Sequence, residues 1–114
     1  MAADAGDQLV AEAFKALGHP IRVRLLREIA EHQLCVSALQ EGLEQTQSNV
    51  SQHLSVLRRC RLVVPERLGN RTCYHLAGDW VAEVLRIAAE GLGVKLDPLP
   101  AVARARARVA GARR

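Results

Sequence analysis

The stretch from Thr46 to Arg59 constrains the possible fold of this chain more than any other part of the sequence. At about 100° per residue, Val50, Leu54 and Leu57 fall within one narrow arc, which predicts a helix with a single apolar stripe. The opposite side carries amides, hydroxyls and guanidinium groups but no carboxylate. A solvated helix face usually mixes both signs of charge, whereas these groups pair with base edges and phosphates. We therefore expect the helix to contact nucleic acid through Gln47, Ser48, Asn49, Ser51, Gln52, His53, Ser55, Arg58 and Arg59.

The residues before this stretch predict three further helices. Apolar residues recur at helical spacing over residues 7–17, and Pro20 suits the first position of a second helix. Ser37-x-x-Gln40 has the pattern of a capping box that opens a third, short helix. A short helix joined by a tight turn to a helix with a polar outer face is typical of a helix-turn-helix.

The alternating hydrophobic pattern of residues 62–76 predicts a β-hairpin with the two-residue turn Gly69-Asn70. With that turn, Val63 pairs with Leu76. A hairpin that follows a recognition helix is a wing. Its tip would carry two arginines that can reach a phosphate or a minor groove, Arg67 and Arg71.

The last predicted helix opens near Asp79, which we expect to cap it, and its apolar surface is wider than one small domain needs to cover. Such a helix usually packs on a partner, most simply a second copy of the chain, with the first helix contributing. We therefore expect a homodimer. The interface is predicted to contain Leu9, Val10, Phe14, Trp80, Val81, Val84, Leu85, Ala88 and Leu92.

Together these elements predict a mainly α fold with a small β-hairpin, in the order α-α-α-α-β-β-α, which is a winged helix-turn-helix. The charge distribution agrees with a partner that is double-stranded DNA. Residues 46–76 carry five basic residues and one acidic residue, a net charge of +4 that equals the net charge of the whole chain. Concentrated positive charge over a reading region is the electrostatic footprint of a nucleic-acid binder.

We divide the 114-residue chain into one domain, residues 1–100, and a low-complexity tail, residues 101–114. The tail holds five arginines and no acid. It either adds sequence-independent phosphate affinity or has no role in binding. No apolar run approaches the roughly 20 residues of a membrane span, so we expect no membrane contact. The N-terminus lacks the basic and apolar regions of a signal peptide, and we expect a cytoplasmic protein.

Four motifs in order resemble the ArsR/SmtB family of bacterial winged-helix repressors. They are LGHPIRVRLL from Leu17, LCVS-x-L from Leu34, QS-x-x-SQHL-x-x-L from Gln47, and R-x-x-x-LV from Arg58 followed by GNRTCYHL from Gly69. The resemblance as a whole covers about residues 8–92. The resemblance implies a homodimeric repressor, with the first and last helices at the interface, that binds a pseudo-palindromic operator and leaves it when an inducer binds.

The resemblance also assigns individual residues. The recognition-helix positions of the family match Gln47, Ser48, Ser51, Gln52 and His53, and its wing positions match Arg67 and Arg71. His53 lies beside the apolar stripe of its helix, so it is either a packing histidine or a phosphate donor.

The three cysteines, Cys35, Cys60 and Cys73, are the candidate sensing residues, because cysteines in a cytoplasmic chain do not form a structural disulfide framework. None of the metal sites known in the resembling family is complete here. Three thiolates suit As(III) or a soft divalent metal ion, which we take as the leading inducer class. The alternatives are a thiol redox or reactive-sulfur switch, which needs only two nearby cysteines, and no cysteine-based sensing at all.

An enzyme is the rival class of function. The sequence has no Ser, His and Asp order typical of hydrolases, no glycine-rich phosphate loop and no cysteine that opens a helix, where a thiol pKa would be lowered. We therefore expect no catalytic residues.

Overall fold

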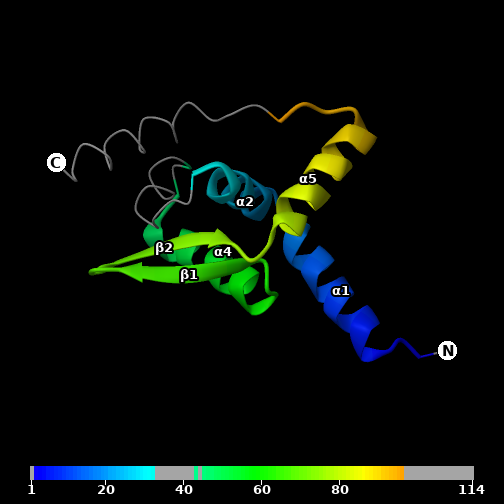
Figure 1. Ribbon diagram of the computed structural model, residues 1–114, viewed down its shortest axis with the longest axis horizontal. Coiled ribbons are helices and arrows are strands. Elements are labelled where there is room, and N and C mark those ends of the chain that lie inside the picture. Colours follow the sequence, from blue (N-terminus) through cyan, green and yellow to red (C-terminus); the bar gives the residue numbers. More distant parts are fainter. Residues whose placement is uncertain (1, 33–42, 44, 97–114) are drawn as a thin grey trace.

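The computed structural model describes residues 2–32, 43 and 45–96. It is a winged helix-turn-helix, as predicted (Figure 1). The hairpin projects away from α1 and α5, and α2 and α4 lie between them. The elements are α1 (Ala5–Leu17), α2 (Pro20–His32), α4 (Gln47–Arg59), β1 (Val63–Leu68), β2 (Arg71–Leu76) and α5 (Asp79–Leu92). The predicted helix that follows Ser37 and its capping box lie outside the described residues, apart from helical Leu43.

One apolar core holds the helices and the base of the hairpin together. Its α4 members are the three residues of the predicted stripe, Val50, Leu54 and Leu57, and all three are fully buried. Burying a side chain of this size stabilises the fold by about 1.5–3 kcal/mol, so this packing fixes the rotation of α4 about its axis. The remaining core residues are Ala16, Leu17, Leu25, Leu26, Ile29, Leu43, Leu62, Val63 and Val81.

The hairpin forms in the predicted register. β1 pairs antiparallel with β2, and Val63 is opposite Leu76. The turn places Gly69 at φ 65°, in the left-handed region, while Asn70 has a negative φ. A turn with positive φ only at its first central residue requires glycine there, so Gly69 determines where the two strands meet.

The last helix differs from the prediction in two details. Gly78, with extended backbone, precedes the helix, and Asp79 is its first residue instead of its cap. Val81, expected at the dimer interface, is fully buried in the protomer's own core, so that part of the prediction is wrong. The apolar residues of α5 are thus divided between the core, where Val81 lies, and the surface, where the others remain exposed or half-buried.

None of the helices in the described part of the chain is long and apolar enough to cross a membrane.

Candidate DNA-binding surface

The helix α4 begins at a well-formed N-terminal cap. Thr46 has extended backbone, and its hydroxyl oxygen accepts a hydrogen bond of 3.1 Å from the backbone N–H of Asn49. The Asn49 amide in turn donates to the Gln45 side chain. These bonds fix the first turn of the helix, where the predicted contacts begin.

The buried stripe of α4 leaves its polar side turned outward. Among the predicted contacts, Asn49 and His53 are half-buried, and the others on this helix are exposed. No acidic residue occurs in the first turn, and two arginines, Arg58 and Arg59, close the last turn. The structure therefore presents one exposed face of amides, hydroxyls and guanidinium groups, which is made by Gln47, Ser48, Ser51, Gln52, Ser55, Arg58 and Arg59.

The flank of this face is organised around His53. Its Nδ1 accepts a hydrogen bond of 3.2 Å from Nε of Arg22 on α2. Its ring also lies against that of His19, with 4.5 Å between the centroids. Burial lowers the pKa of His53, and the neighbouring His19 and Arg22 lower it further. These contacts agree with the packing role considered for His53, and they leave its Nε2 able to donate, as the role of phosphate donor requires.

The wing carries the second set of candidate contacts. Arg67 and Arg71 are both exposed near the turn, and Nε of Arg67 donates to the carbonyl oxygen of Gly69 at 3.2 Å. On the same hairpin, Nδ1 of His75 lies 3.6 Å from a carboxylate oxygen of Glu66. The guanidinium groups therefore lie at the end of the hairpin that is farthest from the core.

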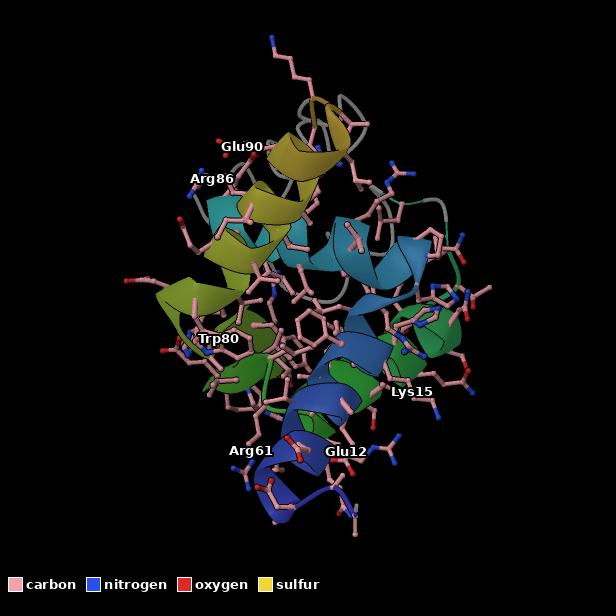
Figure 2. All side chains as sticks on the ribbon, turned by 90° about the vertical axis from the view of Figure 1, so that its right-hand side faces the viewer. Glu12, Lys15, Arg61, Trp80, Arg86 and Glu90 are labelled. Carbon is pink, nitrogen blue, oxygen red and sulfur yellow. The ribbon has the colours of Figure 1, made fainter. Side chains whose placement is uncertain are left out.

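An apolar surface formed by α1 and α5 faces away from the hairpin. Phe14 and Trp80 are 60% and 47% exposed, which is unusual for such large side chains. Figure 2 views this surface, with Trp80 at the start of α5 and the charged Arg86 and Glu90 on the flank turned away from α1. Other predicted interface residues on this surface are Leu9, Val10 and Leu92, which are exposed, and Val84 and Leu85, which are half-buried; Ala88 is exposed as well.

The cysteines have different surroundings. Cys60, at the end of α4, carries a free, half-buried thiol and lines a groove of about 350 Å³ between α1, α4 and α5. Cys73 on β2 is only 2% exposed and is disulfide-bonded, which differs from the expectation that the cysteines form no disulfide. Cys35 lies outside the described residues. Within the described ranges, no three His, Cys, Asp or Glu side chains are grouped closely enough to hold a metal ion.

Three residues of this region were not identified as site residues from the sequence: His19, Arg22 and Arg61. His19 and Arg22 belong to the His53 flank, yet Arg22 is 31 positions from His53 along the chain, and no periodicity links them. Pro20 could have pointed to His19, because the residue before a proline that opens a helix is a candidate for the helix cap. Arg61, exposed directly after α4, has φ 64° and lines the same groove as Cys60.

Comparison with known proteins adds to this geometry. The family model described as "Bacterial regulatory protein, arsR family" matches residues 19–64. An uncharacterized HTH-type transcriptional regulator of Mycobacterium tuberculosis, Rv0081, is 41% identical over 98 residues, which is 83% of this chain and 84% of the relative. Its crystal structure superposes with a TM-score of 0.73 over 80% of this chain and 92% of that one, at 37% identity.

Two further relatives bear on function. A "Transcriptional repressor SmtB homolog" of Synechocystis is 39% identical over 85 residues, covering 75% of this chain and 64% of the relative. The solution structure of a homodimeric winged helix-turn-helix DNA-binding domain from Mycobacterium bovis, described as a possible ArsR-family regulator, has a TM-score of 0.74 at 26% identity. It covers 85% of this chain and 94% of that one.

Proposed function

Because the chain belongs to the ArsR family of bacterial transcriptional regulators, we propose that it is a cytoplasmic repressor that binds operator DNA as a homodimer. The observation that carries this proposal is the exposed, carboxylate-free face of α4 beside a wing tipped with arginines. A major groove admits an α-helix, and amide and hydroxyl groups pair with base edges there. The relative named as a transcriptional repressor supports the direction of regulation.

The roles divide according to chemistry. Ser48 and Gln52 are exposed on the outer side of α4 and would read base edges. Arg58 and Arg59, at the end of the same helix, would contact phosphates, as would Arg67 and Arg71 on the wing. Base contacts determine which sequence is bound, and phosphate contacts determine how strongly any duplex is bound.

The dimer would form through the apolar surface of α1 and α5. Leaving side chains such as Phe14 and Trp80 half exposed is unfavourable for a monomer, and a second copy covers the same patch on both chains at once. A two-fold dimer presents two copies of α4, which predicts a pseudo-palindromic operator with half-sites about one helical turn apart. Residues 1–100 would form this DNA-binding and dimerisation domain, and the arginine tail would add sequence-independent affinity.

The test is DNA binding by the purified dimer, with a duplex selected from a random library and an unrelated duplex of equal length. The double variant Ser48→Ala, Gln52→Ala should lower the ratio of the two affinities, since each lost base contact costs about 1–3 kcal/mol. Arg67→Ala or Arg71→Ala should weaken binding to both duplexes alike. Normal discrimination by the double variant would show that α4 is not the reading helix.

For the inducer, we propose a soft metal or metalloid ion such as As(III), bound through cysteine thiolates. The cysteines available are Cys35, Cys60 and Cys73. Such ligation requires thiolates, so the buried sulfur of Cys73 would have to become reduced and accessible, and the surrounding hairpin would have to move. Movement of the wing is a direct way to weaken DNA binding.

A second candidate is a thiol redox switch, and the observation that favours it is the disulfide bond of Cys73. Two thiols and one peroxide molecule give one disulfide and two water molecules, so peroxide is a sufficient oxidant. In this case the reduced and oxidised chains would differ in DNA affinity without any metal.

Release from the selected duplex by As(III), Cd(II), Zn(II), peroxide and polysulfide separates the two candidates. Each would be tested on the wild type and on Cys35→Ser, Cys60→Ser and Cys73→Ser. Release by As(III) that needs two or more cysteines supports the metalloid inducer. Release by peroxide that dithiothreitol reverses supports the switch, and release by none of the five agents contradicts both.

A further inference from the structure

Two imidazoles and a guanidinium meet where α4 packs against the start of α2. The rings of His19 and His53 have centroids 4.5 Å apart and planes tilted by 51°. Arg22 joins the group through two hydrogen bonds, from Nε to Nδ1 of His53 at 3.2 Å and from Nη1 to the carbonyl oxygen of Ala16 at 3.4 Å. The cluster therefore connects the end of α1, the start of α2 and the middle of α4, and its atoms are held in place relative to the polar face of α4.

The hydrogen bonds determine which ring nitrogen carries the proton. Nδ1 of His53 accepts from Arg22, and Nδ1 of His19 accepts from the backbone N–H of Ile21 at 3.1 Å. A neutral imidazole whose Nδ1 accepts must carry its proton on Nε2. Burial, His19 and Arg22 lower the pKa of His53, which favours this neutral form. Each ring thus offers an N–H donor at Nε2 and keeps no lone pair for a metal ion.

The charge of the cluster favours an anion as its ligand. Arg22 has a full positive charge, and in the described part of the chain no carboxylate forms an ion pair with any of the three side chains. All three are only half-buried, so a ligand can reach them from solvent. Two N–H donors beside a guanidinium form the kind of site that binds phosphate oxygens, because charge-assisted hydrogen bonds to phosphate are short and strong.

The position of the cluster identifies which phosphate. His53 is half-buried beside the apolar stripe of α4, about 100° around the helix from the exposed Gln52, so the cluster lies at the border of the polar face without being part of it. When a helix lies in a groove, its outer face meets the bases and its flanks meet the sugar-phosphate backbone. We propose that His19, Arg22 and His53 form a phosphate-binding site that holds one backbone phosphate of each operator half-site and so fixes the register of α4.

This inference rests on the proposed function, and the experiment separates the two. Full-length wild type, Arg22→Gln, Arg22→Lys and Arg86→Gln would be titrated with the library-selected duplex and the unrelated duplex over a salt series. Arg86 is a matched control, because it is an exposed arginine on α5, engaged with Glu83 and Glu90 on the helix flank away from α1. If the wild type binds neither duplex, the proposed function itself is contradicted.

Arg22→Gln should bind both duplexes roughly tenfold more weakly per half-site, the loss expected for one charge-assisted contact. The slope of log affinity against log salt should flatten by about 0.9 for each protomer, because one phosphate contact is lost. Arg22→Lys should keep the slope, since it keeps the charge, and Arg86→Gln should match the wild type. A wild-type slope in Arg22→Gln, or a flattened slope in Arg22→Lys, overturns the proposal.

Imidazole nitrogen NMR on the wild type gives a second measurement that does not depend on a variant folding. Adding the duplex should shift the Nε2 signals of His19 and His53. Adding millimolar inorganic phosphate should shift them less. Shifts with inorganic phosphate and none with DNA would make this a free-anion site, and the absence of any shift would leave only a packing role; either result overturns the proposal.

Discussion

Replacing Thr46 by aspartate should separate the stability of the recognition helix from its affinity for DNA. Thr46 caps α4 by accepting the N–H of Asn49, and an aspartate can accept the same bond. A carboxylate at a helix N-terminus also interacts favourably with the helix dipole, by about 0.3–1 kcal/mol. We therefore expect Thr46→Asp to melt at the wild-type temperature or slightly above it.

The same carboxylate would weaken DNA binding if the start of α4 lies in the groove. At roughly 6 Å from a phosphate, in a water-like dielectric, the repulsion is about 0.7 kcal/mol per helix. Two helices in a dimer then lose about 1.4 kcal/mol, which is about a tenfold weaker affinity. The loss should shrink at higher salt, because both charges are exposed.

Two further substitutions at this position complete the test, with melting followed by circular dichroism and binding by fluorescence anisotropy. Thr46→Ser should preserve both stability and affinity. Thr46→Ala removes the cap, which costs about 1 kcal/mol and lowers the melting temperature by about 4–8 °C for a domain of this size. If Thr46→Asp binds DNA at low salt as tightly as the wild type, the N-terminus of α4 is not near the backbone and our placement of the helix is incorrect.

Three other predictions concern stability and the wing. Burial and the neighbouring Glu31 raise the pKa of Glu28, because its carboxyl group must ionise in a nearly closed site. The wild type should therefore lose stability as pH rises through that raised pKa. Glu28→Gln should therefore raise the melting temperature at neutral pH, and equal melting of the two proteins at all pH values would contradict this. Burial lowers the pKa of His53 in the folded protein. As pH falls through about 6.5, the unfolded chain therefore binds a proton at this residue more readily than the folded protein does, and the melting temperature should fall. His53→Gln should flatten this part of the melting-temperature profile. Gly69→Ala should cost about 1 kcal/mol because of the positive φ, and should weaken binding to all duplexes alike; an unchanged melting temperature would refute the assigned turn.

The parts of the fold that were predictable depend on local patterns. The stripe of Val50, Leu54 and Leu57 predicted both the helix α4 and its buried side, because apolar residues that recur with a 3.6-residue period line up only on a helix. The turn Gly69-Asn70 predicted the strand register, since a two-residue turn leaves only one pairing.

What was not predictable depends on contacts between distant segments. The pairing of His19 with His53 arises where α2 packs across α4, and neither residue's neighbours in sequence indicate it. Val81 and Trp80 are adjacent in an apolar helix, yet the first is fully buried and the second is half exposed. Periodicity located the stripe of α5 but not the boundary between the core and the apolar surface.

The backbone of Arg61 has a practical consequence for anyone who engineers this protein as a biosensor. A residue with a Cβ is strained by about 1–2 kcal/mol at the φ of 64° that Arg61 adopts. A screen that selects for heat resistance alone should therefore replace Arg61 with glycine or asparagine. That change would remove a guanidinium from the groove next to the free thiol of Cys60, at the junction between α4 and the wing. Heat-resistant variants should therefore be selected with position 61 held as arginine, and any that acquire glycine there should be retested for signal response before use.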